Sequence, residues 1–202
     1  MYFKHVLKNT LCYGLNRMKD LIIFIDSGDT LVDESTEIRD ATGTVIHSKL
    51  IEGAGETLAK LYDSGYTIAL VADGTKASFD NIYRENGLDY CFAVKAISGE
   101  LKHEKPSEIM FLHAMKALGL KDSDKERIVM IGNNIKRDIL GANRMGITSI
   151  LLSYSPRYVM QPENEEEMPD YVISSPCELY DLLEQLNLQV KNKKILNMPK
   201  NK

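Results

Sequence analysis

Tryptophan is absent from this 202-residue sequence, and cysteine is scarce. The three cysteines, Cys12, Cys91 and Cys177, stand far apart and show neither the paired spacing of a zinc site nor that of a disulfide framework. Long hydrophobic runs are also missing, because runs such as 21–25 have five residues where a membrane-spanning helix needs roughly 20. These absences exclude disulfide-rich secreted miniproteins and membrane-spanning proteins, and they favour a reducing, cytoplasmic location.

Acidic charge dominates the middle of the chain. The formal net charge is -4, yet the segments 1–17 and 190–202 contain basic residues and no acidic ones. Three of the 25 basic residues lie in the first segment and five in the second, which leaves 17 against 29 acidic residues between them. Such a body repels nucleic-acid phosphates, so we expect neither a nucleic-acid nor a membrane partner. We interpret 1–17 as an N-terminal extension, 18–189 as a single α/β domain and 190–202 as a basic disordered tail.

The body of the chain alternates strands with helices. Short apolar runs indicate buried strands, and apolar residues at helical spacing indicate helices. The strands are predicted at 21–25, 67–72, 92–97, 128–131, 147–152 and, at a sheet edge, 170–173. The helices are predicted at 55–63, 76–86, 107–118, 135–145 and 175–186. Repeated strand–helix units predict a doubly wound, mostly parallel sheet, whose ligands lie at the carboxyl ends of its strands.

One insertion separates the first strand from the first helix. Within 32–52, two β-type segments, 37–39 and 45–47, flank a short turn sequence. This pattern predicts a β-hairpin that stands above the end of the first strand as a small flap. The segment 153–169 forms a second long loop on the same side, and its Arg157 is a candidate for contacting an anionic substrate group.

Polar residues follow the first two buried strands. Asp26 comes directly after the first strand and begins a tight turn that contains Gly28 and Asp29. A carboxylate in that place is suited to act as a nucleophile or a metal ligand. The second strand is followed by the polar residues 73–75 and then by a helix, whose N-terminal amides favour anions.

Two further polar turns also lie in connections between the predicted strands and helices. Lys105 precedes the third helix and is a compact cation that suits a phosphate or a developing negative charge. Asn133 follows the fourth strand, and Asp138 lies near the start of the next helix. Because the carboxyl ends of parallel strands meet at one edge of a sheet, the four polar turns predict a single site.

Taken in order, these segments resemble the haloacid dehalogenase superfamily of hydrolases. The resemblance covers nearly all of 18–186 and rests on the motifs IFIDSGDTL (23–31), VADG (71–74), KP (105–106), GNN (132–134) and RDI (137–139). It implies a Rossmann-like core with the first strand in the centre. The insertion 32–52 is too short for the large helical cap of many relatives, so the chain is most similar to the capless members.

The resemblance also implies roles for the polar residues. Asp26 would be the covalent nucleophile that accepts a phosphoryl group, and Lys105 its electrostatic partner. Four residues would bind the phosphate group of the substrate, namely Asp73, Gly74, Thr75 and Lys105. Oxygen atoms of four residues would hold Mg2+, namely Asp26, Gly28 through its carbonyl, Asn133 and Asp138.

Three positions depart from the pattern of the superfamily. Relatives that cleave phosphate esters usually have an aspartate two residues after the nucleophile as general acid and base, whereas this chain has Gly28 and places a carboxylate one residue later, at Asp29. Ala72 stands where a serine or threonine is usual, and Asn133 stands where the first acid of the last motif is usual. Fewer carboxylates weaken the attraction for Mg2+, so we expect weak metal binding that depends on Asp138.

Three interpretations of the function follow. The first is a Mg2+-dependent phosphatase that acts on a small phosphorylated compound, with Asp26 as nucleophile and Asp29 as a candidate for the proton transfer. The second is a dehalogenase-type hydrolase, in which Asp26 displaces a group from carbon and no general acid is needed. The third is a binding or regulatory protein on an enzyme core that has lost its activity. A homo-oligomer stays open in each of them.

Overall fold

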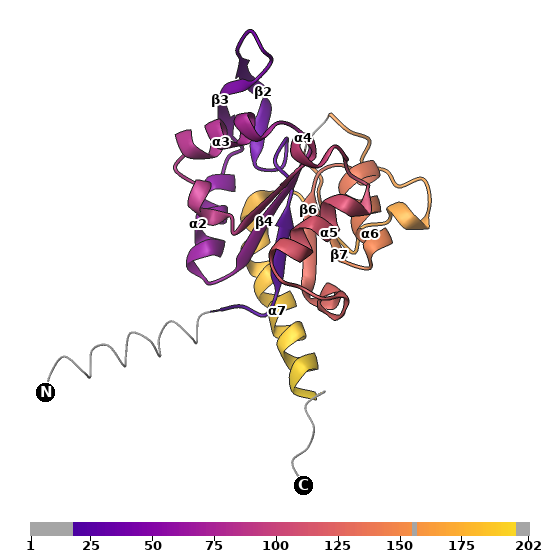
Figure 1. Cartoon of the computed structure of the whole chain (residues 1–202). Helices are drawn as coiled ribbons and strands as arrows, with labels where there is room; N and C mark the ends of the chain where they lie inside the picture. Colours follow the sequence, from indigo (N-terminus) through magenta and orange to yellow (C-terminus); the bar gives the residue numbers. More distant parts are fainter. Residues whose placement is uncertain (1–17, 155–156, 197–202) are drawn as a thin grey trace, which may run out of the picture.

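Six parallel strands form the central sheet of the computed structural model, which describes residues 18–154 and 157–196 (Figure 1). From one edge to the other the strands are β5 (Val94–Ile97), β4 (Thr67–Ala72), β1 (Ile22–Ile25), β6 (Ile128–Gly132), β7 (Thr148–Leu152) and β8 (Tyr171–Ile173). The predicted doubly wound α/β sheet is therefore confirmed, with the first strand inside and the predicted short strand β8 at one edge. The predicted extension 1–17 lies outside the described residues.

The strand register brings the predicted polar turns to one edge of the sheet. Ile25, the last residue of β1, pairs with Leu70 of β4 and with Ile131 of β6. The chain therefore leaves β1, β4 and β6 at the same edge, and Asp26 is the first residue beyond β1. This arrangement is the physical reason why residues far apart in the sequence meet in one place.

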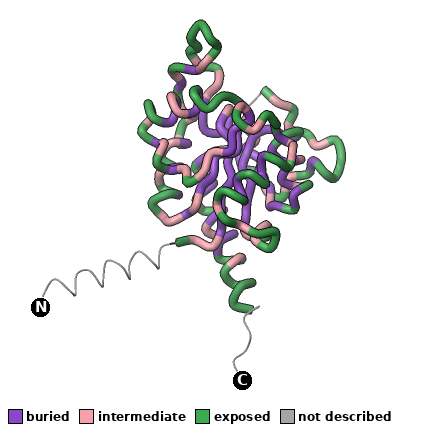
Figure 2. Tube along the Cα trace, viewed as in Figure 1, coloured by how far each residue is buried: buried purple, intermediate pink, exposed green. Residues whose placement is uncertain are grey.

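Helices cover both faces of the sheet and form two apolar cores. Ile23 and Ile25 of β1 belong to one core, whereas Ile22 and Phe24 belong to the other, as the alternation of a strand requires. The first core is completed by α2 (Ala54–Asp63), α3 (Lys76–Glu85) and α7 (Leu179–Leu196). The second is completed by α5 (Glu108–Ala117) and α6 (Leu140–Met145). Figure 2 shows the result, a buried sheet inside a mostly exposed outer layer.

The insertion forms the expected flap. Its strands β2 (Val32–Arg39) and β3 (Val45–Leu50) pair antiparallel and stand above the sheet at the top of Figure 1. Three hydrogen bonds fasten the flap to α3, one of them between His47 Nδ1 and Glu85 Oε1 at 2.5 Å. Val45 N donates to Ser78 Oγ at 3.0 Å, and Asn81 Nδ2 donates to the carbonyl of Val45 at 2.9 Å. The flap is thus attached to the body of the domain beside the carboxyl ends of the strands.

Two helices differ from the prediction. The predicted helix 135–145 begins as a π-helical turn, Ile135–Ile139, before α6. The last helix continues to Leu196, so the prediction of a disordered tail from residue 190 is wrong for residues 190–196. Val190 packs against the first core, and Lys194 pairs with Asp20 at 2.8 Å, which gives the helix partners that the sequence pattern did not reveal. Residues 197–202 of the predicted tail lie outside the described part of the chain. No helix within residues 18–154 and 157–196 has the length and apolarity that a bilayer crossing requires.

Candidate active site

Three buried charged side chains meet at the carboxyl edge of the sheet. Lys105 Nζ lies 2.5 Å from Asp26 Oδ1 and 2.7 Å from Asp138 Oδ1. The side chains of Lys105 and Asp138 are 2% and 1% exposed, and that of Asp26 is 12% exposed. We call these three residues the buried triad. The sequence predicted all three as site residues, and the fold brings them together.

Local backbone structure explains how each carboxylate of the triad is held. Asp26 N continues the sheet by donating to the carbonyl of Ile131 at 2.9 Å, and Thr30 Oγ1 donates to Asp26 Oδ2 at 3.2 Å. Asp138 Oδ2 accepts a hydrogen bond from Asn134 N at 3.0 Å. Asp138 packs so closely on Gly132 that a Cβ there would lie 2.3 Å from the Asp138 carboxyl carbon. Only glycine fits at position 132 without moving the acid.

Burial and charge act in opposite directions within the triad. Burial by itself lowers the pKa of the Lys105 ammonium, but the charges of Asp138 and Asp26 outweigh burial, so the pKa is raised. Burial raises the pKa of Asp138, and the Lys105 charge compensates only in part. Lys105 is therefore a permanent cation at neutral pH, placed against the predicted nucleophile.

The end of β4 supplies the residues predicted to bind phosphate. Asp73 Oδ1 accepts from the backbone N of Lys105 at 3.1 Å, and Asp73 Oδ2 accepts from Arg137 at 3.2 Å. Its negative charge is therefore opposed by a cation at the surface. Gly74 N donates to Ser98 Oγ at 2.9 Å, and the Thr75 side chain caps α3 by accepting from Ser78 N. Asp73, Gly74 and Thr75 line one small cavity together with Ser27 and Gly28 of the turn after β1, and Arg137 adds a positive charge that the prediction did not include.

A second charged group lies between β1 and the flap. Asp29 has a left-handed backbone with φ of 49°, and its Oδ1 accepts from Glu34 N at 3.1 Å. Asp29 Oδ2 forms an ion pair with Arg157, whose Nε also lies 3.6 Å from Glu34 Oε2. We call Asp29, Glu34 and Arg157 the flap cluster. Asp29 is thus tied to the flap cluster, and it has no contact with the Lys105 ammonium.

Glu34 is the site residue that the sequence did not reveal. Burial raises the pKa of Glu34, and the charges of Asp29 and Asp26 raise it further, while Arg157 lowers it. The sequence offered no signal for this residue, because the position of Glu34 depends on the exact register of the hairpin that follows the turn.

The oxygen donors near the triad fit a hard divalent cation. Among the described residues, no three side chains of His, Cys, Asp and Glu form a metal-binding group, so a cation would need neutral ligands besides Asp26 and Asp138. Asn133 is 1% exposed, and none of the described residues accepts a hydrogen bond from its Nδ2. A half-turn of this amide would put its oxygen, a possible metal ligand, where Nδ2 now lies. Two carboxylates, one amide oxygen and the Gly28 carbonyl make an all-oxygen set of the kind that Mg2+ prefers.

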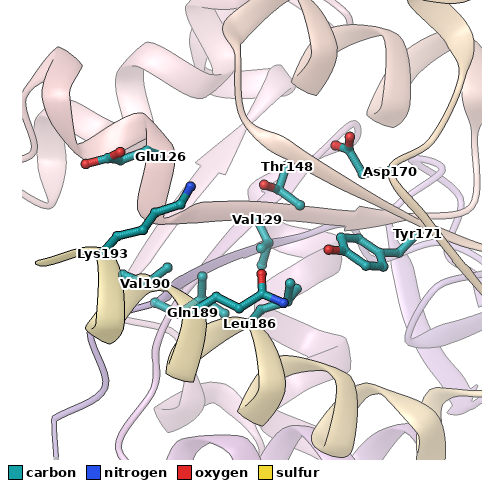
Figure 3. Close-up of a pocket in the computed structure, with 10 residues that line it drawn as sticks. Glu126, Val129, Thr148, Asp170, Tyr171, Leu186, Gln189, Val190 and Lys193 are labelled. Atoms are coloured by element: carbon teal, nitrogen blue, oxygen red, sulfur yellow. The ribbon is translucent and has the colours of Figure 1, made fainter. Parts of the chain in front are cut away.

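A cavity at the amino ends of the strands, the edge opposite the buried triad, has no comparable group of buried charged side chains. Its volume is about 310 Å³, and it lies between α7 and the amino ends of the strands (Figure 3). Its charged side chains are Glu126, Asp170 and Lys193. Asp170 is already bonded to the backbone N of Ser149 at 2.8 Å. The buried triad therefore remains the candidate active site.

Two curated relatives are phosphatases by name. The chain is 31% identical over 130 residues to the glyceraldehyde 3-phosphate phosphatase of Methanopyrus kandleri, which covers 64% of this chain and 54% of that protein. It is 32% identical over 143 residues to the pyrophosphatase PpaX of Halalkalibacterium halodurans, which covers 68% of this chain and 62% of that protein. The chain thus spans little more than half of the length of these relatives.

Solved structures have the same fold. An uncharacterised protein from Listeria monocytogenes serotype 4b aligns with a TM-score of 0.67 at 23% identity, over 83% of this chain and 99% of that one. The putative HAD-hydrolase YfnB from Bacillus subtilis, described as bound to magnesium, aligns with a TM-score of 0.58 at 24% identity, over 67% and 56%. The family model of haloacid dehalogenase-like hydrolases matches residues 16–152. The chain therefore belongs to the haloacid dehalogenase-like hydrolase family.

Proposed function

We propose that this protein is a phosphatase that hydrolyses small phosphorylated compounds through Asp26. The observation that carries the proposal is the buried triad, in which Lys105 Nζ lies 2.5 Å from the Asp26 carboxylate. The names of the curated relatives support phosphate-containing substrates. A cavity of about 120 Å³ between the flap and the turn after β4 supports a small substrate.

Asp26 is the nucleophile in this proposal. Thr30 Oγ1 and Lys105 Nζ hold one carboxylate oxygen each, so the carboxylate is oriented before the substrate arrives. Attack on phosphorus forms an aspartyl phosphate and releases the alcohol, and attack by water then releases phosphate. Lys105 opposes the negative charge that gathers on the phosphoryl oxygens.

The turn after β4 receives the phosphoryl oxygens. Thr75 begins α3, and the free backbone amides of a helix N-terminus attract anions. Gly74 has a φ of 153°, and its amide is held by Ser98, which fixes the course of the turn. Arg137 is 44% exposed beside Asp73 and faces the same edge, where it adds positive charge for an anionic substrate.

Mg2+ completes the site in this proposal. Asp26, Asp138, the Asn133 amide oxygen and the Gly28 carbonyl would hold it, and when bound it would reduce the negative charge that repels a phosphate from two carboxylates. With only two charged ligands among these four, we expect the binding to be weak.

The proposal is tested by phosphate release from p-nitrophenyl phosphate and acetyl phosphate. We expect turnover by the wild type with Mg2+, loss of turnover with EDTA, and loss in Asp26→Asn, because an amide is a poor nucleophile. Equal phosphate release by wild type and Asp26→Asn would instead favour the binding or regulatory protein. Chloride release from chloroacetate without phosphate release would favour the dehalogenase-type hydrolase.

A further inference from the structure

The space beside Gly28 is filled by a carboxylate from the flap. A Cβ placed on Gly28 would lie 1.8 Å from Glu34 Oε1 and 2.7 Å from the Glu34 carboxyl carbon. Gly28 lies two residues beyond Asp26 in the same turn. A carboxylate therefore stands at the place where a side chain of residue 28 would be, although residue 28 has none.

Asp29 and Arg157, the other two members of the flap cluster, hold Glu34 in this place. Glu34 N donates to Asp29 Oδ1 at 3.1 Å, which fixes the backbone where β2 leaves the turn. Glu34 Oε2 lies 3.6 Å from Arg157 Nε. Among the described residues Glu34 Oε1 accepts no hydrogen bond, and the side chain is 33% exposed, so one oxygen remains available to a bound molecule.

Glu34 also faces the small cavity beside the predicted nucleophile. Ser27, Gly28 and Glu34 line this cavity from the β1 side, and Asp73 and Thr75 line it from the end of β4. Ser27 and Gly28 follow Asp26 directly in the chain, so a phosphate ester with its phosphorus at Asp26 can extend into this cavity, and Glu34 forms part of the cavity wall.

The other acids of the site are already engaged. Asp26 and Asp138 both bind the Lys105 ammonium, and Asp73 accepts from Lys105 N and from Arg137. Both oxygens of Asp29 have partners in the flap cluster. Cleavage of an alkyl or aryl phosphate leaves an alkoxide or phenoxide, which departs readily only when an acid supplies a proton. Glu34 is the acid whose position and open oxygen suit that need.

We propose that Glu34 is the proton-transfer residue of this active site, acting from the flap in place of a side chain at position 28. This inference rests on the proposed phosphatase function. In the first step the Asp26–phosphorus bond forms, the phosphorus–oxygen bond of the ester breaks, and the Glu34 proton passes to the leaving oxygen to give an alcohol. In the second step water attacks phosphorus, its proton passes to the Glu34 carboxylate, and phosphate leaves Asp26.

The test compares two substrates that differ in their need for a proton. Phenyl phosphate has a poor leaving group, whereas acetyl phosphate releases acetate, which leaves without a proton. We expect Glu34→Gln to lower kcat on phenyl phosphate by about 10²–10⁴-fold and kcat on acetyl phosphate by less than about tenfold. The matched control is Asp33→Asn, which removes another acid of β2 that is not in the lining of this cavity and should leave both rates unchanged.

Moving the carboxylate provides a second test. Glu34→Ala should lose phenyl phosphate turnover, and adding Gly28→Asp to Glu34→Ala should restore part of it, because the alanine frees the space that a Cβ at position 28 needs. Thermal melting of each variant checks that the fold is intact.

The outcomes separate the two proposals. Turnover by the wild type that Glu34→Gln leaves unchanged, or lowers equally on both substrates, overturns the role of Glu34 and leaves the phosphatase proposal standing. Recovery of Glu34→Gln at high Mg2+ would make Glu34 a metal ligand and would also overturn the role. Wild-type rates no higher than those of Asp26→Asn on both substrates would overturn both proposals.

Discussion

The buried triad and the flap cluster are two charged groups within one site, and they are built in opposite ways. In the triad, Lys105 and Asp138 are at most 2% exposed, and each hydrogen-bonds to a residue from another part of the chain. In the flap cluster, Glu34 is 33% and Arg157 is 43% exposed, whereas the Asp29 between them is 10% exposed. The triad belongs to the ends of the central strands, whereas the cluster joins three loop or flap residues.

The difference in burial determines how much each charged group contributes to folding stability. Removing one member of a buried ion group leaves an uncompensated charge without water, whereas an exposed pair that loses a member is solvated again. The triad therefore matters for folding as well as for chemistry. Glu34 and Arg157, the exposed members of the flap cluster, should therefore change with little effect on folding. The cluster adjoins the turn in which this chain departs from the usual sequence pattern, at Gly28 and Asp29.

The largest effect should follow from Lys105→Met. The methionine keeps much of the volume but leaves Asp26 and Asp138 buried beside each other without a cation. We expect the free energy of unfolding to fall by about 3–5 kcal/mol, measured by urea denaturation. A loss below about 1 kcal/mol would mean that the triad is solvated in the same manner as the flap cluster.

The difference in unfolding free energy between wild type and Lys105→Met should also depend on pH in a way that the pKa of Lys105 predicts. The pKa of Lys105 is raised above its ordinary value of 10.5 in the folded protein, so its contribution to stability is fully present below that value and is lost only as the pH rises through the folded pKa. Without Lys105 the pKa of Asp138 rises further, and ionising this buried acid destabilises the variant as the pH rises, so the gap between wild type and Lys105→Met should stay the same or widen from pH 7 to pH 9. A gap that shrinks between these values would contradict the raised pKa.

A smaller effect is expected for Asp138→Asn on metal binding. The amide keeps the shape but removes one of the two carboxylates available to Mg2+. We expect calorimetry to show the affinity reduced by at least about tenfold, as the loss of a supporting group already costs about that much. Glu34→Gln in the flap cluster is the comparison, and its Mg2+ affinity should stay near that of the wild type. Tight binding that survives Asp138→Asn would contradict the assigned ligands.

The smallest effect is expected for Arg157→Gln. Arg157 is 43% exposed and pairs with Asp29 and Glu34, and exposed ion pairs contribute about 0–1 kcal/mol. Urea denaturation should show a change of unfolding free energy within that range, and added salt should reduce it further. A change as large as that of Lys105→Met would show that the two charged groups are not built differently.

The sequence predicted the triad because its members obey a rule of topology. Asp26 directly follows β1, Asp138 lies in the helical turn that follows β6, and Lys105 lies in the loop before α5. The carboxyl ends of parallel strands meet at one edge, which brings these connections together. Apolar runs likewise predicted the strands, since a strand covered on both faces is apolar throughout. These features depend on local sequence and on a general rule of folds.

The features that the sequence missed depend on long-range contacts. Glu34 reaches Gly28 through the register of β2 after a left-handed residue, Asp29, and no local pattern encodes that register. The end of α7 depends on contacts of Val190 with the core and of Lys194 with Asp20. A basic polar segment without such contacts is usually disordered, so composition alone led to the wrong prediction for residues 190–196.

The two glycines beside the triad differ in how freely they can mutate. A side chain at position 132 would collide with the Asp138 carboxyl carbon at 2.3 Å, and that acid is fixed by two partners, so almost every substitution should be lost in a selection for folded protein. A side chain at position 28 meets only the far end of Glu34, which can rotate away. We therefore expect position 28 to accept substitutions that position 132 does not accept. Paired substitutions at 28 and 34 should be able to move a carboxylate between the turn and the flap while the protein stays folded.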